Sequence, residues 1–231
     1  MLRLDRICAS YGRVQALFDF SLEVRAGEIL CLVGRNGAGK STVIKAIMGL
    51  LPISSGTIEM DGKRISDCPP HRIAGLRIGL VPQGRRLFAE LTVAENLEIG
   101  LMVRGSGAET REMALELFPR LRERLKQVAG TLSGGEQQML ATARALCIEP
   151  RVILLDEPTE GLQPSMITQI RNAVLQLKER NVGILLVEQR VDAVLELADR
   201  VCLMETGRNV EEYSRREVNA FPALLIDHLG I

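Results

Sequence analysis

The stretch from Gly34 to Ser41 has the composition of a phosphate-binding loop. It runs Gly-Arg-Asn-Gly-Ala-Gly-Lys-Ser and fits the pattern G-x-x-x-x-G-K-[ST]. Its glycines allow the backbone to approach a polyphosphate, so that successive N–H groups surround the phosphate oxygens. Lys40 can reach the β- and γ-phosphates, Ser41 can ligate Mg²⁺, and Thr42 can support the same phosphate region. A glycine-rich helix cap is the alternative, but it does not explain the Lys-Ser pair. The loop alone predicts an NTPase or a nucleotide kinase.

Two adjacent carboxylates, Asp156 and Glu157, follow the apolar run Val152 to Leu155. Ligands of open α/β sheets gather at the carboxyl ends of the strands, so this pair is expected to face the same nucleotide. Asp156 can hold Mg²⁺ through water. Glu157 can orient and deprotonate the water that attacks the γ-phosphate. An acidic pair in this position can also be a helix N-terminal charge, but its combination with the phosphate-binding loop favours catalysis.

Short apolar runs rich in Ile, Val and Leu recur along the chain and predict buried parallel strands of an α/β sheet. These runs are Ile29 to Val33, Val152 to Leu155, Ile184 to Val187 and Val201 to Met204. Half-exposed strands are expected within Leu2 to Val24 and Gly56 to Gly62, with turns at Tyr11-Gly12 and Asp61-Gly62, which predicts an antiparallel β layer beside the parallel core.

Helical spacing of apolar residues marks two further regions. Between Gly105 and Gln127 it predicts two short helices that are separated at Pro119. After Pro164 it predicts one helix that ends near Asn181. A third helix should run through Ala145, since Ser133-Gly-Gly-Glu136 is a capping box that can satisfy its first amides. Gly134 and Gly135 are costly in a first helical turn, whereas bare amides at a positive helix end make a good anion site.

Composition narrows the class of protein. The chain has 231 residues, with 29 basic and 29 acidic side chains, so its overall charge gives no reason to expect nucleic acid as a partner. Its five scattered cysteines indicate free thiols rather than disulfides or a metal site. No apolar run is long enough to span a bilayer, and Arg3, Asp5 and Arg6 interrupt the amino terminus. We therefore expect a cytosolic chain that reaches a membrane only through another protein.

The segment Leu132-Ser-Gly-Gly-Glu136 resembles the signature motif of the ATP-binding cassette (ABC) transporter family, and the resemblance extends over nearly the whole chain. It implies an α/β fold of the P-loop NTPase (RecA-like) type, with a parallel-sheet core, an N-terminal antiparallel β layer and a helical subdomain. A single domain would cover residues 1–231, with the β layer and core at about 1–84 and 150–231 and the helical subdomain at about 85–149. Two such chains would close on two ATP molecules.

The resemblance also assigns roles to residues. Tyr11 would stack on adenine, Gln83 would link the metal to the membrane partner, and Ser133 with Gly135 would touch the γ-phosphate bound by the opposite chain. Glu157 and Gln189 would be catalytic, and Ser41, Gln83 and Asp156 would hold Mg²⁺. The expected nucleotide contacts are Tyr11, Gly34, Arg35, Asn36, Gly37, Ala38, Gly39, Lys40, Ser41, Thr42, Gln83, Ser133, Gly134, Gly135 and Glu136.

Two positions depart from the family pattern. Many cassettes have a histidine where Val187-Glu-Gln-Arg190 has Gln189, and the two histidines of this chain, His71 and His228, lie elsewhere. A glutamine amide can donate a hydrogen bond to the γ-phosphate but cannot titrate, so we expect a working switch that is insensitive to pH. Gln163 also replaces an aspartate often found at the subunit contact, which predicts looser coupling between the two ATP sites.

Three parts of the chain together resemble one subgroup, the bacterial importers of branched-chain amino acids, amides and urea. They are Val187-Glu-Gln-Arg190, the run Val81-Pro-Gln-Gly-Arg-Arg-Leu-Phe88 followed by Leu91-Thr-Val-Ala-Glu-Asn96, and Pro158-Thr-Glu-Gly-Leu-Gln-Pro164. The run Pro158-Thr-Glu-Gly-Leu-Gln-Pro164 favours the urea or amide branch, and Glu136-Gln-Gln-Met-Leu140 favours the amino-acid branch. In that subgroup the chain would pair with a different ATPase beneath two membrane permeases, which an extracellular binding protein supplies with solute. A homodimer is the alternative pairing. A soluble non-transport cassette and a nucleotide kinase are the rival classes.

The carboxyl end of the chain is charged and then apolar. Phe221, Leu224, Leu225 and Leu229 recur at roughly helical spacing. So few residues cannot fold alone, and the pattern therefore predicts a short helix packed on the core rather than a regulatory domain.

Overall fold

The structure is a computed structural model that describes residues 1–105 and 107–220. Its centre is a six-stranded sheet in the order β10-β9-β3-β8-β7-β6. The strands are β3 (Ile29–Val33), β6 (Ile78–Val81), β7 (Val152–Asp156), β8 (Gly183–Val187), β9 (Arg200–Glu205) and β10 (Arg208–Ser214). The first five run parallel to one another, and only β10 pairs antiparallel, with β9. The four strands predicted from apolar runs are confirmed, whereas β6 and β10 had not been predicted.

The second sheet is the predicted antiparallel layer, in the order β2-β1-β4-β5. It consists of β1 (Leu2–Tyr11), β2 (Val14–Val24), β4 (Ile53–Met60) and β5 (Lys63–Arg64). In the first half of β1, Leu2 and Leu4 are buried and Arg3 between them is exposed, as expected for a sheet with one face on the core. Turns follow Tyr11 and cover Asp61-Gly62, close to where the sequence predicted them.

Alternate residues of the central strands belong to two different hydrophobic clusters. Cys31 and Leu155 lie in a cluster with the helices, whereas Leu32 and Leu154 lie in a cluster with the N-terminal sheet. All residues of β3, β7 and β8 are buried, since both faces of the central sheet are covered. This packing holds the carboxyl ends of β3, β7 and β8 side by side, which is where the candidate site lies.

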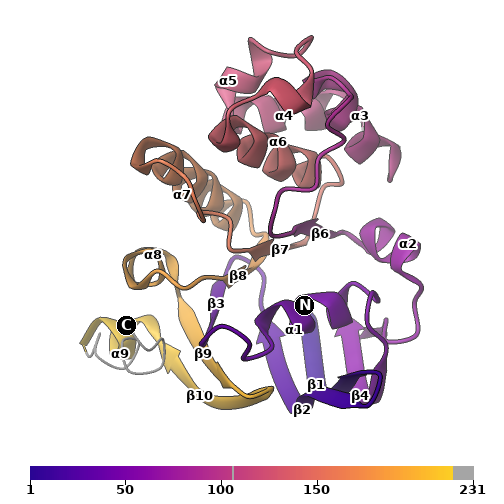
Figure 1. Cartoon of the computed structure of the whole chain (residues 1–231), viewed down its shortest axis with the longest axis vertical. Coiled ribbons are helices and arrows are strands. Elements are labelled where there is room, and N and C mark those ends of the chain that lie inside the picture. Colours follow the sequence, from indigo (N-terminus) through magenta and orange to yellow (C-terminus); the bar gives the residue numbers. More distant parts are fainter. Residues whose placement is uncertain (106, 221–231) are drawn as a thin grey trace.

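Helices α3 to α6 gather at one end of the molecule, and the N-terminal sheet lies at the other (Figure 1). They are α3 (Val93–Met102), α4 (Ala108–Leu117), α5 (Pro119–Arg122) and α6 (Gly134–Leu146). Pro119 begins α5 directly after Phe118, which ends α4, so the predicted break is confirmed. The boundaries of a helical subdomain at about 85 and 149 stay a prediction.

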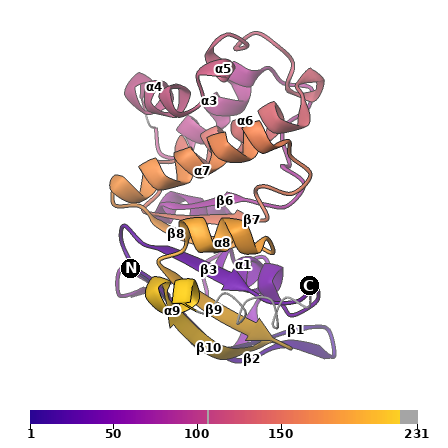
Figure 2. The same ribbon diagram turned by 90° about the vertical axis from the view of Figure 1, so that its left-hand side faces the viewer.

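The other helices surround the sheet. They are α1 (Lys40–Ile47), α2 (Pro70–Ile73), α7 (Pro164–Glu179), α8 (Val191–Leu197) and α9 (Arg215–Ala220), with short 3₁₀ turns at Ala74–Leu76 and Ala129–Thr131. In Figure 2 the helix α7 lies between the sheet and the α3–α6 end of the molecule. The predicted helix after Pro164 is thus confirmed. Phe221, Leu224, Leu225 and Leu229 lie outside the described residues.

Two predictions from composition can also be compared with the structure. The five cysteines are free thiols; Cys31, Cys147 and Cys202 are buried, and Cys8 and Cys68 are half-buried. Within residues 1–105 and 107–220, no helix has the length and apolar character needed to span a membrane.

Candidate functional site

The predicted phosphate-binding loop connects β3 to α1, as its sequence context requires. Gly39 is the N-cap of α1 and has a φ of 111°. Because glycine has no side chain, no side-chain hydrogen bond caps the first turn of the helix. Gly34 packs so closely that a Cβ atom there would lie 2.2 Å from the carbonyl oxygen of Met204. Glycine is needed at both positions, for conformation at one and for space at the other. The N–H groups of Thr42 and Val43 donate to the Gly39 carbonyl, and those of Lys40 and Ser41, ahead of them, form an anion-binding end beside the loop.

The polar side chains of α1 point back to the loop and to β7. Lys40 is buried, and its Nζ donates to the carbonyl oxygens of Gly34 at 2.6 Å and Arg35 at 3.1 Å. Burial lowers the pKa of Lys40. The Ser41 hydroxyl donates to Oδ1 of Asp156 at 3.3 Å, and burial raises the pKa of that carboxyl. The hydroxyl and the carboxylate therefore lie together, at the end of β7, beside the loop.

Glu157 lies at the centre of the site and has a strained backbone. Its φ is 49°, which is uncommon outside glycine, and its N–H donates to the carbonyl of Val187 at 3.0 Å. Burial raises the pKa of its carboxyl, and the hydrogen bond from Gln189 opposes that shift. A carboxylate with a raised pKa, held at the carboxyl edge of a parallel sheet, is suited to act as a general base.

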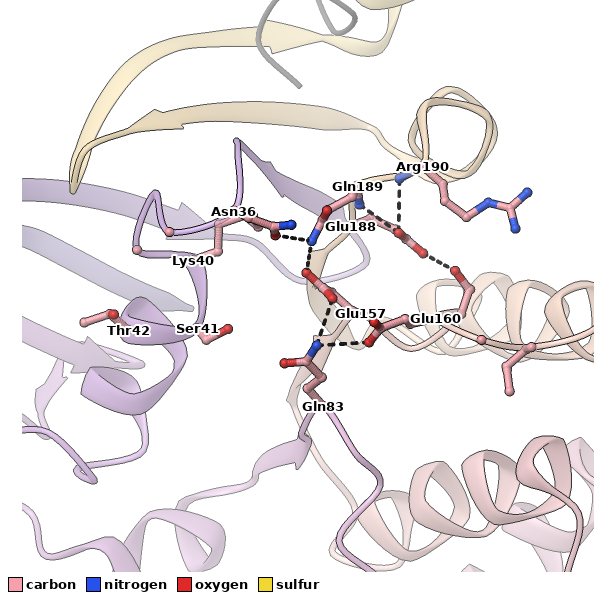
Figure 3. A pocket seen from close by; sticks show the side chains of 15 residues that line it. Asn36, Lys40, Ser41, Thr42, Gln83, Glu157, Glu160, Glu188, Gln189 and Arg190 are labelled. Carbon is pink, nitrogen blue, oxygen red and sulfur yellow. Dashed lines mark hydrogen bonds between the residues drawn. The ribbon is translucent and has the colours of Figure 1, made fainter. Parts of the chain in front are cut away.

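Two glutamine amides hold the Glu157 carboxylate, one on each oxygen (Figure 3). Nε2 of Gln189 donates to Oε1, and Nε2 of Gln83 donates to Oε2 at 3.2 Å. Gln189 also donates to Oδ1 of Asn36 at 2.8 Å, and Gln83 also donates to Oε2 of Glu160 at 3.0 Å. The two amides thereby join the phosphate-binding loop, the end of β7 and the segment after β6 around one acid.

These residues border one pocket with a volume of about 600 Å³. Its lining brings together half of the predicted site residues: Asn36, Gly37, Gly39, Lys40, Ser41, Thr42, Gln83, Glu157 and Gln189, with Thr159, Glu160, Gly161, Leu162, Glu188 and Arg190. Arg35 and Ala38 line a separate hollow on the other side of the loop, with Met204 to Thr206. Asp156 lies beside the pocket through its bond with Ser41.

Tyr11 lies outside this pocket, at the end of β1. Its ring is 45% exposed, its hydroxyl accepts from Nζ of Lys45 at 3.2 Å, and that ammonium lies 5.3 Å from the ring centroid. Because part of the ring is exposed, Tyr11 is accessible for stacking on adenine. This role stays a prediction.

The signature segment Ser133 to Glu136 likewise does not line the pocket. It forms the N-terminal end of α6, with Ser133 as the N-cap. Its capping box is confirmed: Ser133 Oγ accepts from the N–H of Glu136 at 3.4 Å, and Glu136 Oε2 accepts from the N–H of Ser133 at 3.0 Å. Arg124 Nε lies 2.9 Å from Oε1 of Glu136. Burial opposes ionisation of Glu136, but the bonds from Ser133 and the charge of Arg124 outweigh it, so its pKa is lowered.

Both carboxylate oxygens of Glu136 are therefore engaged within the chain, and this acid positions the segment rather than offering a free ligand. Gly134 and Gly135 pack against side chains, since a Cβ on Gly134 would lie 3.0 Å from Nη2 of Arg85 and one on Gly135 would lie 2.5 Å from Cγ of Met166.

Six pocket residues were not predicted from the sequence: Thr159, Glu160, Gly161, Leu162, Glu188 and Arg190. They lie within the strings Pro158-Thr-Glu-Gly-Leu-Gln-Pro164 and Val187-Glu-Gln-Arg190, whose composition was noted without a role for these side chains. A polar residue directly after a buried strand is the signal that could have found Glu188.

Comparison with known proteins gives consistent matches. The model of a family described as ABC transporter matches residues 17–160. The chain is 47% identical over 212 residues to the high-affinity branched-chain amino acid transport ATP-binding protein BraG of Pseudomonas aeruginosa, covering 91% of both chains. It is 41% identical to the probable branched-chain amino acid transport ATP-binding protein LivF of Archaeoglobus fulgidus, covering 90% of this chain and 89% of the relative. The dimeric structure of MJ0796, a bacterial ABC transporter cassette, aligns with a TM-score of 0.85 at 26% identity, over 94% of this chain and 99% of that one.

Proposed function

The chain belongs to the ABC transporter family, and from that premise we propose that it is the ATP-hydrolysing subunit of a bacterial importer of branched-chain amino acids. It binds ATP and hydrolyses it, as ABC transporter ATPases do. The single observation that carries the assignment of the site is the position of Glu157, whose carboxylate lies in the same pocket as Lys40 and Ser41.

The phosphate-binding loop would hold the triphosphate of ATP. The N–H groups of the first turn of α1 donate to its phosphate oxygens, and Lys40 exchanges the carbonyls of Gly34 and Arg35 for the β- and γ-phosphates. This change of partners keeps the buried Lys40 ammonium bonded to oxygen atoms, with phosphate oxygens in place of the two carbonyls. Tyr11 would support the adenine from the end of β1.

The residues around Ser41 fit a magnesium ion. Mg²⁺ prefers oxygen ligands and is usually held by one or two protein groups together with water and phosphate oxygens. The Ser41 hydroxyl and the Asp156 carboxylate lie 3.3 Å apart, Gln83 lines the same pocket as Ser41, and these three residues would hold the ion. When bound, Mg²⁺ neutralises developing charge on the phosphates.

Glu157 would act on the water that attacks the γ-phosphate. Its carboxylate accepts a proton from that water while the oxygen bonds to phosphorus and the bond to the departing ADP oxygen breaks. The amides of Gln83 and Gln189 fix the direction of the carboxylate, since each donates to one of its oxygens. Gln189 would also donate to the γ-phosphate, with the N–H that bonds Asn36 in the structure, in the place where many relatives have a histidine.

A second cassette would supply what this pocket lacks. The N-terminal end of α6, with Ser133 and Gly135, would contact the γ-phosphate bound by the opposite chain. The dimeric structure of a similar cassette supports pairing of two cassettes. The mate would be a related but different ATPase, with a homodimer as the alternative. Two permease subunits, docked beside Gln83, would hold the pair at the cytoplasmic face of the membrane, and a solute-binding protein would supply them.

The solute is assigned from the names of the two similar transport proteins. Deletion of the chain in its own cell should abolish uptake of labelled leucine, isoleucine and valine and leave uptake of urea and acetamide intact. Complementation with the natural chain should restore that uptake, and complementation with Glu157→Gln should not. Loss of urea or amide uptake, with amino-acid uptake unchanged, would assign the chain to the alternative branch instead.

A further inference from the structure

Glu188 is a buried acid for which the hydrolysis steps above have no use. It follows β8, lies directly before Gln189 and is only 3% exposed. A buried carboxylate is costly unless hydrogen-bond donors surround it. Glu188 has three: its Oε1 accepts from the Thr159 hydroxyl, and its Oε2 accepts from the backbone N–H of Gln189 at 2.8 Å and of Arg190 at 3.3 Å (Figure 3).

The donors of Glu188 are neutral groups, although a guanidinium follows two residues later. Arg190 pairs instead with Asp192, with its Nη2 2.8 Å from Oδ2 of that aspartate. Glu188 is therefore not the ion-pair partner of Arg190. The carboxylate links the Thr159 side chain to two consecutive backbone amides. One oxygen accepts from the Thr159 hydroxyl, and the other accepts from the N–H groups of Gln189 and Arg190. An amide side chain has a single acceptor oxygen and cannot replace both.

Thr159 lies at the start of the segment that leads from the catalytic acid to α7. Its side chain is 3% exposed. The N–H of Glu160 donates to the carbonyl of Glu157 at 3.2 Å, and the N–H of Leu162 donates to the carbonyl of Thr159 at 3.3 Å. These two bonds form successive turns between Glu157 and Leu162, directly before Gln163. Under the proposed function this segment faces the second cassette.

We propose that Glu188 is a positioning residue that couples the segment Thr159–Gln163 to the amide of Gln189. When the second cassette contacts the segment, the Thr159 hydroxyl moves and the Glu188 carboxylate follows it. Because the other oxygen holds the N–H groups of Gln189 and Arg190, the backbone that carries the Gln189 side chain follows as well. Gln189 in turn contacts Glu157 and Asn36, so docking of the mate adjusts the catalytic acid.

The test removes one oxygen atom at Thr159. Thr159→Val keeps a β-branched side chain of the same shape but cannot donate to Glu188, whereas Thr159→Ser keeps the hydroxyl and is the matched control. Steady-state ATP hydrolysis by the full chain is measured with whichever mate supports the natural chain's turnover. Because a hydrogen bond to a buried charge is lost, we expect kcat to fall about tenfold in Thr159→Val, with KM for ATP within about twofold of the natural value. Thr159→Ser should retain most of kcat.

A role limited to stability would give a different result. Thr159→Val would then lower the melting temperature but leave kcat unchanged, and that outcome would overturn the coupling. A rise in KM that accounts for the whole loss would also overturn it, because the pocket itself would be disturbed. If Thr159→Val does not fold, Glu188→Leu gives the same test with the same expected fall in kcat, because leucine has no polar atom to bond the Thr159 hydroxyl or the two backbone N–H groups. The inference rests on the proposed function, and absence of hydrolysis by the natural chain would refute that function rather than the coupling.

Discussion

The two regions predicted to contact nucleotide differ in how they are built. The phosphate-binding loop, Glu157, Gln83 and Gln189 face one another across a pocket of about 600 Å³ within a single chain. The start of α6, at Ser133 to Glu136, does not line that pocket, and its own side chains are engaged in capping the helix. One region can surround a phosphate chain, and the other can only add to a site from outside. Their difference explains why each chain would need the α6 end of another.

The largest expected effect lies in the pocket. Glu157→Gln keeps the shape of the side chain but cannot take a proton from water, so turnover should fall roughly 10²- to 10³-fold. ATP binding should persist, since the loop and Lys40 are unchanged. Lys40→Ala is the complementary variant and should lose affinity for ATP. Single-turnover hydrolysis and equilibrium binding of labelled ATP separate the two effects. Normal hydrolysis by Glu157→Gln would remove this acid from the mechanism.

A smaller effect is expected at the start of α6, where a matched control exists in α3. Ser133 and Thr92 both form complete capping boxes, with Glu136 and Glu95 respectively. Replacing either by alanine should cost about 1 kcal/mol of stability through loss of the cap. Ser133→Ala should in addition lower kcat roughly tenfold or more, because a donor to the transferred phosphate is lost. Thr92→Ala should leave kcat unchanged. Equal kcat values in the two variants would limit Ser133 to capping.

The smallest expected effect is in the pH dependence of kcat, which reports which pocket residues titrate. Glu157 must be ionised to act as a base, and its pKa is raised above the ordinary 4.5 by burial. Activity should therefore fall on acidification through a pKa above 4.5, with no further ionisation near neutrality, because Gln189 does not titrate. Gln189→His should add an ionisation near about 6.5. The pH dependence of kcat for both chains measures this. A neutral-pH inflection already present in the natural chain would contradict the assignment.

Some features were predictable because they are local. Ile29–Val33 and Gly183–Val187 are continuous apolar runs, and the loop Gly34 to Ser41 has a fixed spacing with a known physical purpose. By contrast, β6 contains Gly79 and is recognisable as a strand only by its ladder with β7. The bond between Thr159 and Glu188 spans 29 positions and exists because the ends of β7 and β8 are neighbours. No local pattern encodes such a contact.

The division between a pocket and an external donor can be tested by mixing two defective chains. Lys40→Ala disables the pocket but keeps α6 intact, and Ser133→Arg blocks the α6 end but keeps the pocket. ATP hydrolysis is measured for each variant alone, for the mixture and for the natural chain under the same conditions. Where two copies of this chain pair and the natural chain alone hydrolyses ATP, we predict that each variant alone is nearly inactive and that the mixture recovers a clear fraction of the natural rate, because one complete site forms between the two chains. A mixture as inactive as its components, beside an active natural chain, would contradict the account.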